Sequence, residues 1–164
     1  PCLMALDAEI ELSSVRGRRR LGLAAFLTGA RQTALQPDEL VIAIHIPEEA
    51  EAGISSFHKL GARHYLVISI AMVAVRLVIE ADVIISARIA IGACAPVATR
   101  LQELEATLVG VSLDEAPARA QQIDDHIHRS LAPIDDVRAS TDYRYRAAAK
   151  ITQRMIADLC VEAA

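Results

Sequence analysis

The chain has 164 residues, a length that suits one domain, or one small domain together with part of another. Its hydrophobic fraction is 53% but only 3% of the residues are aromatic, so Ala, Val, Ile and Leu must fill the core. The formal net charge of −4 gives no general attraction to nucleic acid or to an anionic membrane, and we expect neither as a partner.

The amino-terminal part is expected to consist of strands joined by turns. The sequence begins at Pro1 in the middle of an apolar pattern, and we expect an upstream segment to be missing from it. Residues 5–12 alternate apolar and polar side chains, which is the period of a half-buried strand. A turn at 13–17 then leads to a returning strand at 20–23, and the basic run 18–20 is expected to be solvated rather than a phosphate site.

A domain boundary is expected near residue 50. Residues 40–46 place four apolar side chains on one face of a strand, which Pro47 ends because proline cannot donate to a ladder. Residues 48–53 are acidic and contain almost no large apolar side chain. The sequence therefore predicts that residues 1–49 belong to one domain and residues 50–164 to another.

The middle of the chain predicts a long antiparallel hairpin that follows a strand at 55–60. Its two arms are residues 66–79 and 83–94, and the acidic segment 80–82 reverses the chain between them. The longest apolar stretch, residues 65–75, is shorter than the roughly 20 residues needed to span a bilayer. We therefore expect a buried sheet and no membrane segment.

The last third of the chain predicts three helices. Two of them are expected to begin at capping boxes, formed by Thr99 with Gln102 and by Ser112 with Glu115. The third is expected to begin near Thr141 and carries apolar residues at helical spacing. Strands followed by helices favour an α+β fold, in which an antiparallel sheet has three helices packed on one face.

The sequence contains no catalytic signature and no glycine-rich phosphate-binding motif. The run of two Asp and two His residues at 124–128 is the strongest metal candidate, but a polar helix end is the favoured interpretation. Asp135 and Asp136 could hold magnesium, although beside Pro133 they are expected to cap a loop. His45 is expected to be a satisfied or outward-facing histidine of a strand. We therefore predict no catalytic residue and no metal site in the chain.

The cysteines indicate a reducing environment. The chain has three cysteines, an odd number, at Cys2, Cys94 and Cys160. They lie far apart in the sequence and form no Cys-x-x-Cys pair. They predict buried thiols in a cytoplasmic protein rather than a disulfide framework.

The segment FHKLGAR at 57–63 sets two cations, Lys59 and Arg63, where one strand joins the long hairpin. Cations at such a junction form either a polar rim or part of a binding site. Composition does not choose between these two interpretations.

At this segment the chain resembles the FAD-binding subunit of the xanthine dehydrogenase and carbon monoxide dehydrogenase family. Five blocks, which together extend over nearly the whole chain, resemble the family in the same order. They are LDAEIEL at 6–12, RQTALQPDEL at 31–40 with IHIP at 44–47, FHKLGAR at 57–63 with ISI at 68–70, ARIAIGACAP at 87–96 and DDVRASTDYR at 135–144.

The resemblance implies the end of a PCMH-type FAD-binding domain, followed by a CO dehydrogenase flavoprotein C-terminal domain. It implies that electrons from iron–sulfur clusters pass through FAD to an acceptor, and that the protein positions and tunes the flavin. Lys59 and Val41 stand where family members approach the flavin, and Gln32 is a third contact by position. The implied partners are a molybdopterin-binding large subunit and a small subunit that carries 2Fe–2S clusters.

Two departures from the family pattern affect these expectations. His64 and Tyr65 stand where many relatives carry charged residues, which leaves the electron acceptor open. The family's pyrophosphate loops, which begin Ala-Gly-Gly, do not occur in this sequence, so we expect the 164 residues alone to bind FAD weakly or not at all. The alternative function is a non-catalytic interaction or homodimerisation domain that uses an apolar sheet face.

Overall fold

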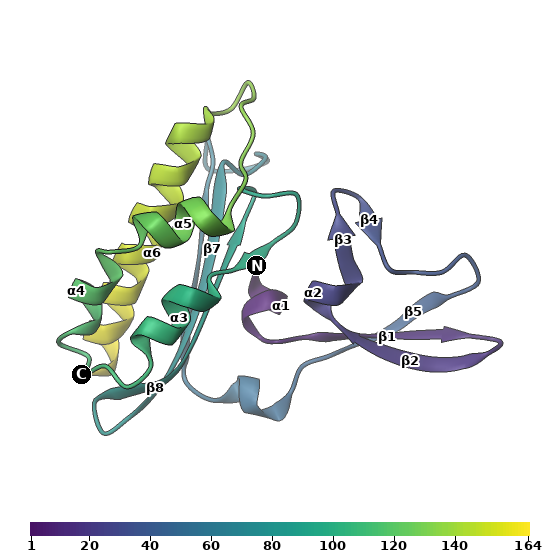
Figure 1. The fold of residues 1–164 in the computed structure, drawn as a ribbon, viewed down its shortest axis with the longest axis horizontal. Helices are drawn as coiled ribbons and strands as arrows, with labels where there is room; N and C mark the ends of the chain where they lie inside the picture. Colours follow the sequence, from purple (N-terminus) through teal and green to yellow (C-terminus); the bar gives the residue numbers. More distant parts are fainter.

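Four antiparallel strands form the larger sheet of the computed structural model, which describes residues 1–164 (Figure 1). The strands lie in the order β6 (Ile54–Leu60), β7 (Ala71–Glu80), β8 (Val83–Gly92) and β9 (Thr99–Arg100). Ala81 and Asp82 both have positive φ, 48° and 61°, and so form the kind of two-residue turn that matches the twist of a hairpin. The expected hairpin of β7 and β8 is confirmed, although β7 begins at Ala71 rather than at residue 66.

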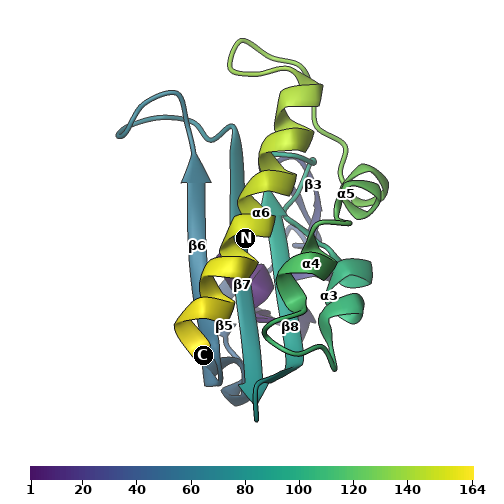
Figure 2. The ribbon, with the colours of Figure 1, turned by 90° about the vertical axis from the view of Figure 1, so that its left-hand side faces the viewer.

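Helices cover one face of this sheet, as Figure 2 shows. They are α3 (Gln102–Leu108), α4 (Ala116–Ala120), α5 (Asp124–Ser130) and α6 (Thr141–Ala163). One cluster of 25 buried residues fills the space between the two layers, with Ile89, Leu104 and Ile156 fully buried in it. The expected α+β fold, with helices packed on one face of an antiparallel sheet, is confirmed. None of these helices combines the length and the apolar character needed to cross a bilayer.

The helix starts differ from the predicted ones except at α6. Ser140 caps α6 by accepting a hydrogen bond from the backbone N–H of Tyr143 at 3.2 Å. Both predicted capping boxes are wrong: Thr99 pairs in β9 instead, and neither α3 nor α4 has a side-chain cap. The second expected helix is divided into α4 and α5, with residues 121–123 between them.

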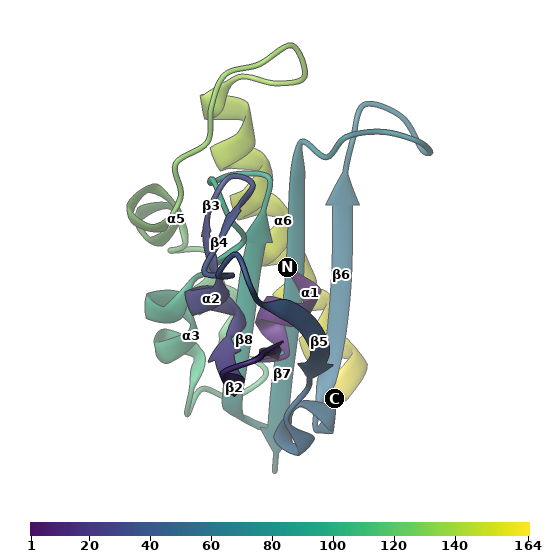
Figure 3. The same ribbon diagram turned by 90° about the vertical axis from the view of Figure 1, so that its right-hand side faces the viewer.

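The amino-terminal residues form smaller elements on the other side of the large sheet (Figure 3). The three-stranded sheet has the order β2 (Gly17–Gly22), β1 (Glu9–Ser14) and β5 (Leu40–His45), and its small core contains Ile10, Leu12 and Phe26. The other elements are α1 (Cys2–Ala5), α2 (Leu23–Phe26), the hairpin of β3 (Leu27–Gly29) with β4 (Gln32–Thr33), and the 3-10 helix η1 (Glu48–Glu51).

The first predicted strand begins later than expected. Residue 5 ends α1 instead, and Met4 and Ala5 pack against Ala74 of β7 and Ala90 of β8. Small side chains at these two paired strand positions let the helix approach the sheet closely. The amino-terminal segment therefore rests on the sheet face opposite α6.

Candidate functional site

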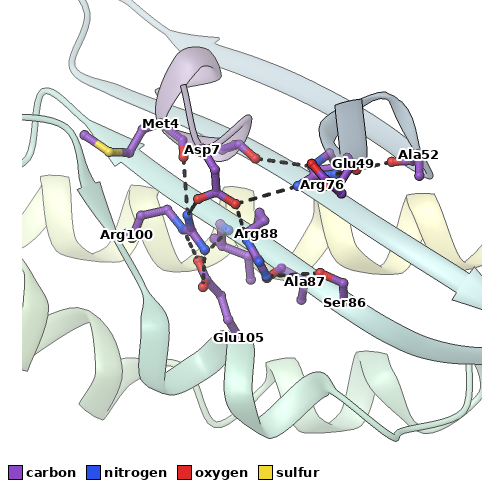
Figure 4. Close-up of polar contacts among 12 residues, drawn as sticks. Met4, Asp7, Glu49, Ala52, Arg76, Ser86, Ala87, Arg88, Arg100 and Glu105 are labelled. Carbon is purple, nitrogen blue, oxygen red and sulfur yellow. Dashed lines mark hydrogen bonds and ion pairs between the residues drawn. The ribbon is translucent and has the colours of Figure 1, made fainter. Parts of the chain in front are cut away.

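Asp7 joins the amino-terminal segment to the large sheet through three arginines (Figure 4). It follows α1 with a positive φ of 49°, which turns its carboxylate toward the sheet. Arg88 donates to it at 2.6 Å, Arg100 is bonded to its other oxygen, and Arg76 lies 3.9 Å away. Burial opposes ionisation of this carboxyl, but the bonds and charges of Arg88 and Arg100 outweigh it and lower its pKa.

Glu105 completes this network from the helical layer. Its carboxylate accepts two hydrogen bonds from Arg100, at 2.5 and 2.6 Å, and a third from the backbone N–H of Ile89 at 2.8 Å. Arg76 in turn donates to the carbonyl oxygens of Ala5 and Glu49, at 3.3 and 2.9 Å. These bonds fix both ends of residues 1–52 on the sheet and so hold β5 and β6 in a defined relation.

Lys59 lies on the sheet face that carries the amino-terminal segment. It pairs with Met72 of β7. Side chains two residues apart on a strand share a face, so Met72 lies on the same face as Ala74, which packs against α1. Val73, between them, faces the large core on the helical side. His58, which directly precedes Lys59, points to the other face and lines a cavity with residues of α6. The side chain of Lys59 is exposed and makes no hydrogen bond or ion pair, so its ammonium is free to meet an anion or a ring.

Val41 and Gln32 lie on the smaller elements on that side of the sheet. Val41 of β5 pairs with Leu12 of β1. It is 48% exposed, which leaves an apolar surface beside the small core. Gln32 is exposed in β4, and its side-chain oxygen would lie 2.9 Å from a Cβ at Gly29. No hydrogen bond connects Gln32, Val41 and Lys59 to one another, and each comes from a different strand.

The loop between β6 and β7 presents exposed aromatic and apolar side chains. Gly61 permits its closure, because a Cβ there would lie 2.5 Å from Cγ1 of Val67. Arg63 donates to the carbonyl oxygen of Leu66 at 2.6 Å, and Leu66 has a φ of 50°. The rings of His64 and Tyr65 lie 5.9 Å apart, and Tyr65 is 81% exposed. The loop thus holds an aromatic group out toward solvent next to the strand that carries Lys59.

The acidic and histidine candidates make other contacts. His126 lies 3.3 Å from Glu103, and the ring of His128 packs at 4.2 Å on that of Tyr145. Asp136 accepts a hydrogen bond from Arg144 at 2.8 Å, as expected of a residue that fixes a loop. Nowhere in the chain do three His, Cys, Asp or Glu side chains converge as metal ligands would.

His45 lies 2.5 Å from a carboxylate oxygen of Glu11, which satisfies it as expected. Of the cysteines, Cys94 and Cys160 are buried and Cys2 is exposed, so the expectation of buried thiols is confirmed for two of the three. Burial raises the pKa of the Cys94 thiol to about 11, which keeps it protonated and inert.

Comparison with protein families finds two successive matches. Residues 56–159 match the model of the CO dehydrogenase flavoprotein C-terminal domain. Residues 1–49 match the FAD binding domain in molybdopterin dehydrogenase. The division at residue 49 that the sequence suggested remains a prediction.

Individual relatives are similar over almost the whole chain. The nicotine 6-hydroxylase medium subunit of Paenarthrobacter nicotinovorans is 31% identical, over 95% of this chain and 53% of its own length. The xanthine dehydrogenase FAD-binding subunit of Escherichia coli is 28% identical, over 93% of this chain and 52% of its own length. The chain thus spans about half the length of the curated relatives that it matches.

Solved structures share the arrangement of both parts. Quinoline 2-oxidoreductase from Pseudomonas putida 86 superposes with a TM-score of 0.85 at 27% identity, over 98% of this chain and 55% of that one. Reconstituted CO dehydrogenase from Oligotropha carboxidovorans gives a TM-score of 0.79 at 29% identity, over 97% of this chain and 55% of that one. The chain therefore belongs to the CO dehydrogenase flavoprotein C-terminal domain family, found in the FAD subunits of molybdenum hydroxylases.

Proposed function

We propose that this chain forms one side of the FAD site in the flavin subunit of a molybdenum hydroxylase. Residues 1–49 would be the end of the FAD-binding domain, and residues 50–164 the C-terminal domain. The observation that carries the proposal is the free ammonium of Lys59, on the same side of the large sheet as the half-exposed Val41. Family membership supports it.

The exposed groups of this side fit a flavin. FAD, when bound, supplies the electron transfer between the iron–sulfur clusters and the acceptor. The positive charge of Lys59 would stabilise negative charge on a reduced isoalloxazine ring, because opposite charges attract strongly where water is excluded. Val41 would exclude water from one face of the ring, and Gln32 would be a third contact. In this proposal the chain positions the flavin and has no catalytic residue of its own.

Other parts of the proposal concern the whole enzyme. We propose a molybdopterin-binding large subunit and an iron–sulfur small subunit as partners, and a location in the cytoplasm. The relatives support such an assembly, since one of them is a subunit of the 6-hydroxypseudooxynicotine dehydrogenase complex.

We also propose that residues 1–164 bind FAD weakly on their own. Small-molecule sites normally bury most of the ligand, whereas Gln32, Val41 and Lys59 are exposed and line none of the five best-defined cavities. Titration of the chain with FAD, followed by flavin fluorescence, should give no tight stoichiometric complex.

Val41→Asp in the complete flavin subunit should weaken FAD binding about tenfold or more, because a carboxylate would lose water against the ring. Leu40→Asp is the matched control, since it adds the same charge at the neighbouring, 72% exposed position. FAD content and affinity of both purified variants provide the measurement. Equal FAD binding by the two variants would favour the alternative function, a non-catalytic interaction domain.

A further inference from the structure

The strand β6 forms an open edge of the large sheet. It is seven residues long and pairs only with β7, so the backbone groups on its outer side have no partner in the chain. An unpaired edge of this length can accept another extended segment through main-chain hydrogen bonds. Figure 2 shows this edge beside α6.

A groove follows this edge on the helical face of the sheet. Two adjoining cavities of about 420 and 400 Å³ lie between β6 and α6 and share His58, Lys150 and Ile151. Leu60 and Met155 add apolar surface to the two cavities. The groove is therefore long enough for several residues and offers apolar contacts along a polar rim.

The rim of the groove is positively charged at its centre. Arg146, Lys150 and Arg154 follow one another at intervals of four residues along α6 and line the cavities. Arg146 pairs with Asp142 at 2.5 Å and Arg154 pairs with Asp158 at 3.5 Å. Lys150, between them, has no ion-pair partner and faces the cavity that His58 also lines.

We propose that this groove binds an extended acidic segment of a partner protein, which adds as a fifth strand beside β6. Main-chain bonds to the edge would supply affinity. Alternate side chains would reach the groove, where a carboxylate would meet Lys150 and apolar groups would meet Leu60 and Ile151. A second copy of this chain fits poorly, because it would bring the same cations face to face. The site is independent of the proposed flavin function, since His58 and Lys59 point to opposite faces of the sheet.

A labelled octapeptide of sequence Val-Thr-Glu-Thr-Val-Thr-Glu-Thr, whose Val and Glu side chains all lie on one face of an extended strand, is a suitable probe. Fluorescence anisotropy should show that it binds to the chain, and hydrogen exchange should show added protection of the β6 amides. Two further peptides test the mode of binding: one has Lys in place of Glu, and one carries N-methyl groups on the amides of one edge. Both should bind at least about tenfold more weakly, because the first reverses the charge and the second blocks strand pairing.

Lys150→Glu should weaken binding of the Val–Glu peptide about tenfold or more. This variant is expected to keep its fold, because a glutamate there lies four residues from both Arg146 and Arg154. Arg119→Glu, which makes the same charge change at an exposed site on α4, should leave the affinity unchanged. The proposal is overturned if the Val–Lys or N-methylated peptide binds equally well, or if Lys150→Glu binds like Arg119→Glu. It is also overturned if light scattering shows a dimer whose β6 amides are protected without the peptide.

Discussion

Replacement of Glu105 by alanine is expected to lower the free energy of unfolding by about 3–5 kcal/mol. Glu105 is almost completely buried and accepts hydrogen bonds from Arg100 and from the backbone of Ile89. Alanine would leave the guanidinium of Arg100 with only Asp7 as a charged partner, and the N–H of Ile89 with no acceptor. Urea-induced unfolding, followed by circular dichroism, measures the change.

Glu103→Ala is the matched control for Glu105→Ala. Glu103 lies on the same helix, but it is 59% exposed and pairs with Arg129 at 3.0 Å. An exposed pair of this kind contributes about 0–1 kcal/mol. Similar losses of stability in the two variants would contradict the importance given to burial in the network of Asp7, Arg100 and Glu105.

Gly53→Ala is expected to destabilise the chain by about 2–5 kcal/mol, because it combines two costs. Gly53 has a φ of 90°, a conformation that L-residues rarely adopt. A Cβ at this position would also lie only 2.2 Å from the carbonyl oxygen of Leu77, which is backbone and cannot rotate away. The entry into β6 would therefore have to move. The midpoint and slope of urea unfolding measure the effect.

Gly110→Ala separates the two costs. Gly110 has a similar φ of 82°, but a Cβ there would meet nothing within 4 Å. Its replacement should cost only the conformational part, about 1–2 kcal/mol. Equal destabilisation by Gly53→Ala and Gly110→Ala would mean that the contact with Leu77 is relieved without cost.

The strands and the long helix could be predicted from local pattern, whereas the short elements could not. The alternation along residues 83–92 and the helical spacing after Thr141 each extend over several turns or pleats, so the signal is strong. Residues 2–5 are all apolar and show no period, and they form a helix because Ala74 and Ala90 provide a surface for it. Thr99 forms a strand pair with Ile91, a tertiary contact that overrides its capping pattern.

The candidate site was only partly predictable, because it too depends on tertiary contacts that local pattern does not reveal. Lys59 and Val41 came from family resemblance, since their own neighbourhoods do not distinguish a binding site from a polar rim. The Asp7 network was missed because its partners lie 81 and 93 residues away. One signal was available: Arg76 and Arg88 stand in mostly apolar strands, and two facing arginines in a buried hairpin require a carboxylate.

The most direct test of the proposed role is the midpoint potential of the flavin in the assembled enzyme that carries Lys59→Met. Loss of the cation should make the reduced flavin less favourable and lower the two-electron potential by about 30 mV, which corresponds to about 1.4 kcal/mol. Lys150→Met removes the only other lysine of the chain, which lies on α6 at the opposite face of the sheet, and it should leave the potential unchanged. Unchanged potentials in both variants, with FAD fully bound, would contradict a place for Lys59 beside the flavin.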